Sequence, residues 1–216
     1  KLALFDLDDT LFDVDTEGEW VKFMDQTNLI KDSNFFKKME NFENKYRQGK
    51  LDVDEYSEFL LSPIIGISLE ELENSIEIFS SDIVQRFTDN LTKDLLQKHK
   101  EDTKILTSGS LSFLVNKIAL KLGIEISFGT DPEYLDGFFT GKVKGYPNFS
   151  EEKVRRIKFW MDSEQFDEIF SYSDSIHDLP LLEFSDFPIA ISPDSKLRVI
   201  AQERNWPIYY RRDFYS

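Results

Sequence analysis

Residues 2–11 read Leu-Ala-Leu-Phe-Asp-Leu-Asp-Asp-Thr-Leu, a short apolar run that stops at a group of acidic residues. The run from Leu2 to Phe5 is typical of a strand buried on both faces, although its length alone does not exclude a helix. Asp6 and Asp8 follow directly, and residues two apart on an extended segment point to the same side. The stretch therefore predicts a buried strand that brings two carboxylates to one pocket. A solvated acidic turn is the alternative interpretation of this pair taken alone.

The next part of the chain has helical spacing of its apolar residues. This spacing predicts helices over residues 16–50 and 53–61, the second ending before Pro63. Ser68-Leu-Glu-Glu is a capping-box pattern that opens a long helical segment to about residue 100, with Ser80–Ser81 as a candidate break. His99, near its end, is expected to be an exposed helix residue.

After residue 103, predicted strands and helices alternate. Asp136-Gly137 is a turn signal between two short strands within residues 134–143. Strands that alternate with helices imply parallel pairing with crossover connections. We therefore expect an α/β fold, in which a Rossmann-like parallel sheet is flanked by helices and a helical cap is inserted after the first strand. Residues 1–15 and 83–216 are expected to form the core, and residues 16–82 the cap.

Composition excludes several function classes. There are 26 Lys and Arg residues against 41 Asp and Glu, a formal charge of −15, which disfavours binding to nucleic acid or an anionic membrane. The absence of Cys excludes disulfides and thiolate chemistry, and two His residues disfavour a His-rich metal site. No apolar run approaches the ~20 residues of a membrane span, and no targeting segment is recognisable at the start. We expect a soluble, cytoplasmic protein.

Polar residues follow several of the predicted strands. Ligands of open parallel sheets bind at the carboxyl ends of strands, so these residues are expected to converge. Four carboxylates at one edge repel one another unless a cation joins them, and an oxygen-rich set without His or Cys favours Mg²⁺. With a Lys and hydroxyls as donors to an anion, the set suits phosphoryl transfer. The residues are Asp6, Asp8, Thr107, Ser108, Gly109, Lys153, Asp174 and Asp178.

Four segments carry a family resemblance because they occur together and in order. They are Phe5–Leu11, Leu106–Ser110, Glu152–Val154 and Tyr172–Pro180. The chain resembles the haloacid dehalogenase superfamily of phosphohydrolases, in its phosphoserine-phosphatase-like branch. Residues 49–56, 136–141 and 205–208 are similar to a histidinol-phosphatase-like subgroup of that branch.

The resemblance implies a Mg²⁺-dependent phosphomonoesterase that acts on a small soluble phosphate ester through an aspartyl-phosphate. Asp6 would be the nucleophile and Lys153 would neutralise its charge and that of the phosphoryl group. Asp8 would protonate the leaving alkoxide, accept a proton from water and lend its backbone carbonyl to Mg²⁺. The implied metal set is Asp6, Asp8 and Asp174, with Asp178 bound directly or through water.

The resemblance also implies that Ser108 and the Gly109 N–H hold phosphoryl oxygens. Thr107 is the rival hydroxyl. Ser108 is preferred because its distance of fifteen residues from Gly123 matches the pattern of the branch.

Two departures from the family pattern bear on the substrate. His177 stands where Asn is usual, and it could donate to a phosphate or serve only as a spacer. Glu58, nine residues after Gly49, stands where phosphoserine phosphatases hold the substrate carboxylate with Arg. Asp15, nine residues after Asp6, matches a substrate-contacting position. Acidic residues at these places favour an amine over a carboxylate on the substrate.

Two alternative functions remain open from the sequence. A phosphotransferase or mutase of the same fold would pass the phosphoryl group to an alcohol. A phosphoacceptor signalling or binding protein of the receiver type would also group carboxylates, a hydroxyl and a Lys. That second alternative is disfavoured because receivers lack an acid two residues after the phosphorylated Asp and have no large helical insert.

Overall fold

The computed structural model describes residues 1–48, 50–162 and 164–214. Its main sheet has the strand order β3-β2-β1-β6-β7-β8, and every described pair in it is parallel. The predicted parallel α/β fold is therefore confirmed. The first strand lies at the centre, and the chain order reverses beside it, which is where open sheets bind ligands. The strands are β1 (Leu2–Phe5), β2 (Thr103–Leu111), β3 (Ile126–Thr130), β6 (Ile169–Ser173), β7 (Phe187–Ile191) and β8 (Ile208–Tyr209).

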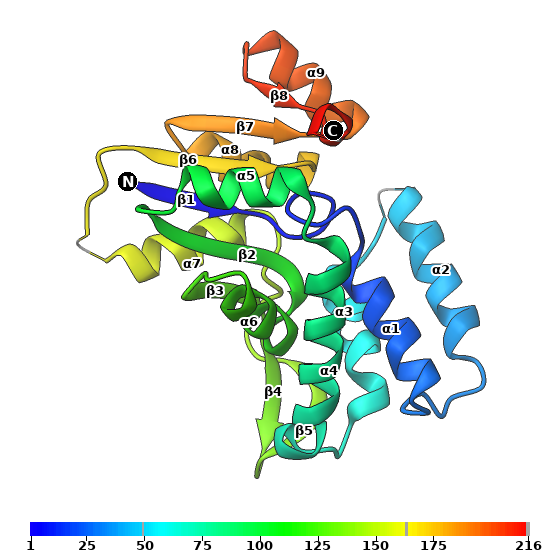
Figure 1. Ribbon diagram of the computed structural model, residues 1–216. Helices are drawn as coiled ribbons and strands as arrows, with labels where there is room; N and C mark the ends of the chain where they lie inside the picture. Colours follow the sequence, from blue (N-terminus) through cyan, green and yellow to red (C-terminus); the bar gives the residue numbers. More distant parts are fainter. Residues whose placement is uncertain (49, 163, 215–216) are drawn as a thin grey trace.

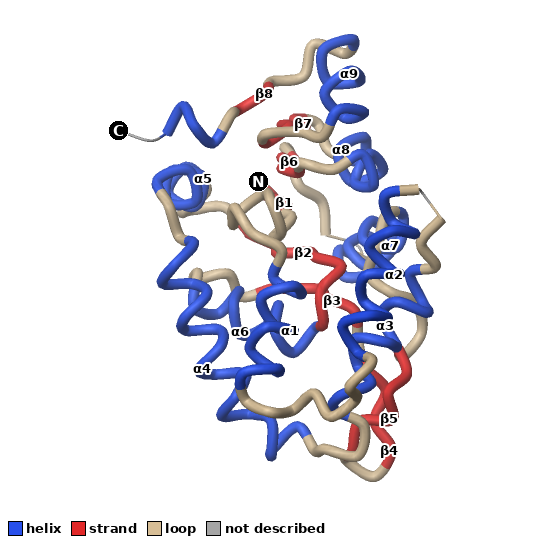
Figure 2. Tube along the Cα trace, turned by 90° about the vertical axis from the view of Figure 1, so that its right-hand side faces the viewer, coloured by secondary structure: helices blue, strands red, loops and turns tan. Residues whose placement is uncertain are grey.

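Helices cover both faces of this sheet (Figure 2). Ala3 and Phe5 belong to the core cluster of one face, with residues of α4 (Leu69–Phe87), α5 (Asn90–Lys98) and α6 (Ser112–Lys121). Leu2 and Leu4 belong to the cluster of the other face, with residues of α7 (Glu151–Met161) and α8 (Leu179–Phe184). The alternation along β1 places side chains on both faces, so the strand is fully buried. Next to the sheet edge, α9 (Ser195–Glu203) packs on β7.

Three helices lie beyond the carboxyl end of β1 (Figure 1): α1 (Thr16–Gln26), α2 (Phe35–Arg47) and α3 (Val53–Leu61). Asp15 caps α1 by accepting a hydrogen bond from Gly18 N at 3.1 Å. The ring of Phe59 connects α3 with α2, because it stacks on Phe35 at 4.4 Å and lies 4.9 Å from Phe42. The predicted helical insert therefore forms a small aromatic unit over the end of the sheet.

The long helix α4 has no break at Ser80–Ser81. Its predicted capping box is confirmed, with Ser68 and Glu71 satisfying each other's backbone N–H groups. Ser80 is buried on the same face as Ile76 and Ile83, and no Gly or Pro interrupts the turn. The expected boundary between cap and core, at residues 82–83, falls inside this continuous helix, and the division into two domains stays a prediction. The helix ends only at Phe87, and Asp89 then caps the next helix, α5.

The predicted hairpin is confirmed. Its antiparallel strands β4 (Pro132–Leu135) and β5 (Phe138–Val143) turn at Asp136-Gly137, where both residues have positive φ angles. Phe139 on β5 exchanges backbone hydrogen bonds of 2.9 Å with Gly66 and Ile67, which follow the short helix η1 (Ser62–Ile64). No helix in the described ranges is long and apolar enough to cross a membrane. The cytoplasmic location stays a prediction.

Candidate active site

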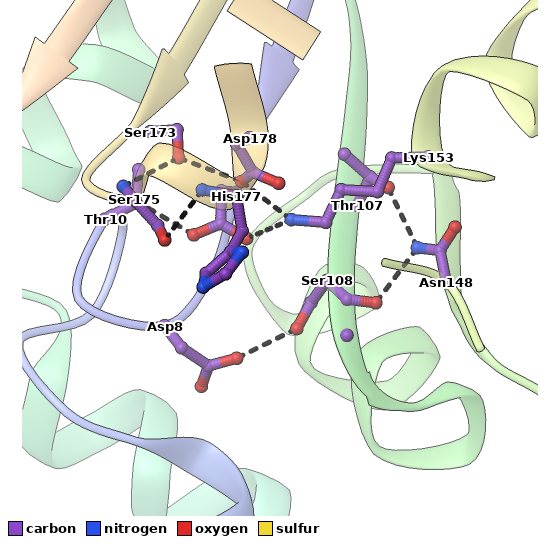
Figure 3. Close-up of polar contacts among 12 residues, drawn as sticks. Asp8, Thr10, Thr107, Ser108, Asn148, Lys153, Ser173, Ser175, His177 and Asp178 are labelled. Carbon is purple, nitrogen blue, oxygen red and sulfur yellow. Dashed lines mark hydrogen bonds and ion pairs between the residues drawn. The ribbon is translucent and has the colours of Figure 1, made fainter. Parts of the chain in front are cut away.

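Asp6, the first residue after β1, lies beside the Lys153 ammonium. Lys153 comes from the first turn of α7, and its Nζ lies 2.8 Å from Asp6 Oδ1 and 2.8 Å from Asp178 Oδ2. All three side chains are buried, with 8% or less of each exposed. Ser173, at the end of β6, also donates to Asp178 Oδ2 at 2.8 Å (Figure 3). The ends of β1 and β6 and the start of α7 therefore meet, as the parallel sheet predicts.

The hydroxyl of Thr10 also links the ends of β1 and β6. Its Oγ1 lies 3.0 Å from Asp6 Oδ2 and 3.1 Å from Asp174 Oδ1. The same oxygen accepts a hydrogen bond from the backbone N–H of Asp174 at 3.0 Å. Because Thr10 is fully buried, this contact fixes the loop after β1 against the loop after β6.

The pocket contains more negative charge than its one Lys balances. Burial raises the pKa of Asp6 to about 7, with Lys153 acting against it and Asp178 and Asp8 adding to it. Burial and the neighbouring charge of Asp6 raise the pKa of Asp174 to about 8. Burial alone would lower the pKa of Lys153, but the Asp178 and Asp6 carboxylates outweigh it and raise this pKa. The site therefore favours a bound cation in addition to Lys153.

The side chains at this edge of the sheet offer oxygen atoms, the type of ligand that suits Mg²⁺. Among the described residues no three acidic or His side chains converge closely enough to form a metal site as they stand, since Lys153 and Thr10 lie between the carboxylates. The groups are nevertheless hard oxygen donors, and burial together with the charges of neighbouring carboxylates raises the pKa values of Asp6 and Asp174. Oxygen donors with unbalanced negative charge fit a hard divalent cation.

Asp8 lies two residues from Asp6 and is held by a different set of donors. Its Oδ2 accepts hydrogen bonds from Ser108 at 2.9 Å and Ser110 at 3.1 Å, and its Oδ1 accepts from Thr16 N at 2.6 Å. Figure 3 shows the Asp8 carboxylate directed at Ser108. The three donors from β2 and α1 give this carboxylate a fixed orientation.

The two rival hydroxyls on β2 point to opposite sides. Thr107 Oγ1 accepts a hydrogen bond from Asn148 Nδ2 at 3.0 Å, away from Asp8 (Figure 3). Asn148 is fully buried and also donates to the carbonyls of Ser108 at 2.9 Å and Phe128 at 3.0 Å. Thr107 thus helps to anchor the strand, and Ser108 is the hydroxyl near the predicted catalytic pair.

A cavity of about 460 Å³ opens over these residues toward the cap. Asp15 and His177 line it, as do three residues of α3, Val53, Tyr56 and Ser57. Glu58 is exposed on the same helix and is not among the described lining residues. The cavity is lined by Asp6, Asp8, Asp9, Asp15, Glu17, Met39, Phe42, Leu51, Val53, Tyr56, Ser57, Gly109, Ser110, Phe149, Lys153, Asp174, Ser175, His177 and Asp178.

The cap side of the cavity is acidic and apolar. Although Asp15 is exposed, partial desolvation of its carboxyl group in the cleft and the charge of Asp8 raise its pKa to about 6. Burial raises the pKa of Glu17 well above its usual value, and Asp15 adds to this shift. On the core side, the rings of His177 and Phe149 lie 4.9 Å apart. The wall opposite Asp6 thus presents two carboxyl groups beside apolar and aromatic side chains.

Four residues of the site were missed in the sequence. Ser110 follows Ser108 by two, a spacing that places both side chains on one side of a strand, so that signal was present. Thr10 lies within the first motif, but its link to Asp174 depends on contact between two distant loops. No local pattern distinguishes Glu17 or Asn148 from ordinary polar surface residues.

Comparisons with known proteins show the family of the chain. A family model described as haloacid dehalogenase-like hydrolase matches residues 3–183. A histidinol-phosphatase from Neisseria meningitidis serogroup C (strain 8013) is 30% identical over 96% of this chain and 97% of its own length.

Solved structures give the same fold. A protein of unknown function from Bordetella pertussis Tohama I is 34% identical, with a TM-score of 0.88 over 96% of this chain and 97% of its own. A substrate-bound phosphoserine phosphatase has a TM-score of 0.66 and 20% identity over 97% of this chain and 92% of its own, a likeness of fold. The chain belongs to the haloacid dehalogenase-like hydrolase family, and two of the proteins similar to it over nearly its whole length are named as phosphatases.

Proposed function

We propose that the chain is a Mg²⁺-dependent phosphatase that hydrolyses a small phosphate monoester through an aspartyl-phosphate at Asp6. The observation that carries the proposal is the buried Asp6 carboxylate, 2.8 Å from the Lys153 ammonium, with Asp8 held in a fixed orientation two residues away. A carboxylate nucleophile and a second carboxyl group for proton transfer are the two groups that such a reaction needs.

In the first step an oxygen of Asp6 forms a bond to phosphorus and the P–O bond of the ester breaks. Asp8, protonated at this stage, gives its proton to the leaving alkoxide. In the second step Asp8 takes a proton from water, the water oxygen attacks phosphorus, and phosphate leaves with Asp6 regenerated. Lys153 offsets the charge of Asp6, so a phosphate dianion can approach it.

Ser108 and the Gly109 N–H are proposed to orient the phosphoryl oxygens. Asp6 and Asp174 would hold Mg²⁺ directly with the backbone carbonyl of Asp8. Asp178, whose Oδ2 already accepts from Lys153 and Ser173, would act through water. Bound there, Mg²⁺ supplies positive charge that stabilises the phosphoryl oxygens in the transition state.

The cavity supports a substrate with a cationic group. Asp15 and Glu17 can accept hydrogen bonds from an ammonium, and the apolar side chains of Met39, Phe42 and Tyr56 can cover a flat ring. The relative named histidinol-phosphatase is consistent with a small amino-alcohol phosphate. We propose an ester of this class as the substrate.

Turnover of para-nitrophenyl phosphate with and without Mg²⁺ tests the proposal. Wild-type protein quenched in acid during turnover should carry a phosphoryl group on the peptide that contains Asp6, detected by mass spectrometry. Asp6→Asn should fold normally but lose both the label and turnover, because an amide of the same shape cannot form the acyl-phosphate. Asp25→Asn, an exposed carboxylate on α1, is the matched control. Retention of more than about a hundredth of wild-type activity in Asp6→Asn contradicts the nucleophile assignment.

Two outcomes of the same assay would favour the alternatives. A phosphotransferase would transfer the phosphoryl group to an added alcohol in preference to water. A phosphoacceptor protein would take up one phosphoryl group and release none on the time scale of catalysis.

A further inference from the structure

Arg211 is a buried cation near the end of the described chain. It lies in the short helix η3 (Arg211–Phe214), and only 4% of it is exposed. Its guanidinium donates through Nη1 to Asp89 Oδ2 at 2.5 Å and through Nη2 to the carbonyl of Thr10. Nη2 also lies 3.3 Å from the carbonyl of Leu11. A fork of this kind joins three chain segments that are far apart in sequence.

The two carbonyls that Arg211 contacts belong to the loop that follows the nucleophile. Thr10 is therefore held at two points: Arg211 binds its carbonyl, and its hydroxyl contacts the Asp6 and Asp174 carboxylates. A shift of the Thr10 backbone would move that hydroxyl away from the two carboxylates. Arg211 thus acts on the reacting groups through Thr10.

A second group holds the loop from the same side. Thr92, in the first turn of α5, donates through Oγ1 to the carbonyl of Leu11. Asp89, which pairs with Arg211, also caps α5 by accepting from Thr92 N at 2.9 Å. Arg211 Nε has no hydrogen-bond partner in the described ranges and lies 3.8 Å from Asp13 Oδ1, in the same loop. Three of these four groups around the guanidinium, the carbonyls of Thr10 and Leu11 and the Asp13 carboxylate, therefore belong to the loop between Asp8 and Val14.

We propose that Arg211 is a positioning residue, which fixes the loop after β1 so that Thr10 keeps Asp6 and Asp174 in their reactive arrangement. The inference rests on the proposed phosphatase function. The neighbouring Arg212 serves as the control. Its side chain is 77% exposed, and among the described residues it forms an ion pair with Asp213 at 3.8 Å.

The test compares Arg211→Lys and Asp89→Asn with Arg212→Lys. Lysine keeps the charge but cannot bridge Asp89 and the carbonyls together. Asparagine keeps the cap of α5, because it is as good an N-cap as aspartate, and removes the charge that pairs with Arg211. Both changes therefore loosen the loop while leaving the elements of the fold in place.

The first readout is kinetic. We expect kcat with para-nitrophenyl phosphate to fall at least about tenfold in Arg211→Lys, because small displacements of reacting groups cost up to about a hundredfold. KM should stay within about threefold of wild type, since no substrate contact is removed. Arg212→Lys should match the wild type in both constants.

The second readout does not depend on activity. The amides of Asp9, Thr10 and Phe12 donate to backbone carbonyls of Val14 and Leu7, so they are protected from hydrogen exchange. Mass spectrometry of peptides covering residues 7–14 should show faster exchange in Arg211→Lys and Asp89→Asn, with exchange in β2 and β6 unchanged.

The outcomes separate the two proposals. Wild-type protein without phosphatase activity would defeat the proposed function, while the exchange data would still decide whether Arg211 holds the loop. Unchanged kcat and unchanged exchange in residues 7–14 would overturn the inference. So would faster exchange throughout the protein with unchanged kcat, which is the result of a purely structural role.

Discussion

Lys153 Nζ lies 2.8 Å from Asp6 Oδ1, although 147 residues separate the two along the chain. The same nitrogen lies 2.8 Å from Asp178 Oδ2, so one buried cation serves two buried carboxylates. This relationship makes the site sensitive to the loss of a single positive charge.

Lys153→Met should destabilise the protein most where both carboxylates are ionised. Removal of one partner from a buried ion pair costs about 3–5 kcal/mol, because the other charge stays unpaired. We expect this loss in the free energy of unfolding at pH 9 and a smaller loss at pH 5, where Asp6 takes up a proton. Urea unfolding at the two pH values measures it. Lys158→Met, an exposed position on the same helix, should change stability by less than about 0.5 kcal/mol. An equal loss at both pH values would show that Lys153 does not pair with an ionised Asp6.

Chelation should abolish activity, and Mg²⁺ should restore it. The carboxylates of Asp6, Asp8, Asp174 and Asp178 face the cavity with Lys153 as the compensating charge, so a phosphate dianion meets net repulsion without a second cation. Treatment with EDTA followed by titration with Mg²⁺ measures the effect. Binding of beryllofluoride, followed by a change in thermal stability, should weaken in parallel. Full activity in a preparation verified to be free of metal would rule out this role.

The stability of the protein should fall between pH 7 and pH 5 through His99. Burial and the positive charges of Lys98 and Lys104 lower the pKa of His99 despite Asp102. The unfolded chain, with a His pKa of about 6.5, then binds more protons than the folded chain. The contribution is complete above the unfolded pKa and is lost as the pH falls toward the folded value, by at most about 1.4 kcal/mol per pH unit.

Urea unfolding of wild type and His99→Gln over this pH range checks the prediction. The difference in the free energy of unfolding between wild type and His99→Gln isolates His99, because the other titrating groups contribute equally to both proteins. This difference should become smaller as the pH falls. A difference that stays constant with pH would mean that His99 is not held neutral in the fold.

Phosphoserine should be a poor substrate relative to histidinol phosphate. A substrate carboxylate would face Asp15 and Glu17 with no compensating Arg among the described lining residues, while an ammonium would be attracted. We expect a difference of at least about tenfold in kcat/KM, equivalent to about 1.4 kcal/mol, with glycerol phosphate between the two.

Three variants identify the acidic residues that are responsible. Asp15→Asn and Glu17→Gln should lower kcat/KM for histidinol phosphate toward that for glycerol phosphate, and Glu58→Gln should have no effect because its side chain is exposed outside the cavity. A larger effect of Glu58→Gln would instead support the position predicted from the sequence. If phosphoserine is the best of the three substrates, this interpretation of the cap is wrong.

The sequence predicted the parallel sheet and the elements that form it because the signals are local. Apolar runs, turn residues and caps mark each element, and the capping box at Ser68 and the hairpin turn at Asp136-Gly137 are confirmed. Parallel topology then brings together Asp6, Lys153 and Asp174, whose positions follow from the ends of elements.

The residues that the sequence did not predict correctly are those whose surroundings depend on contacts between segments far apart in the chain. His99 is flanked by Lys98 and Lys100, and was expected to be exposed, but it is buried and lies 2.7 Å from the hydroxyl of Tyr172. No sequence pattern indicates that Arg211 contacts the loop after β1. Glu17 enters the cavity because α1 begins where Asp15 caps it, a position that helical spacing alone does not define.

The central position of β1 determines when the site can form during synthesis of the chain. Leu4 pairs with Ile105 on one side and with Ser171 on the other, so β1 must wait for partner strands that leave the ribosome later. A nascent chain that stops before β6 lacks Asp174 and Asp178. In such a chain β1, which precedes Asp6, has no β6 beside it. Long-range parallel pairing of this kind folds slowly. The enzyme should therefore become competent only after β6 and the loop that follows it have left the ribosome, and ribosome-bound chains ending before β6 should be inactive.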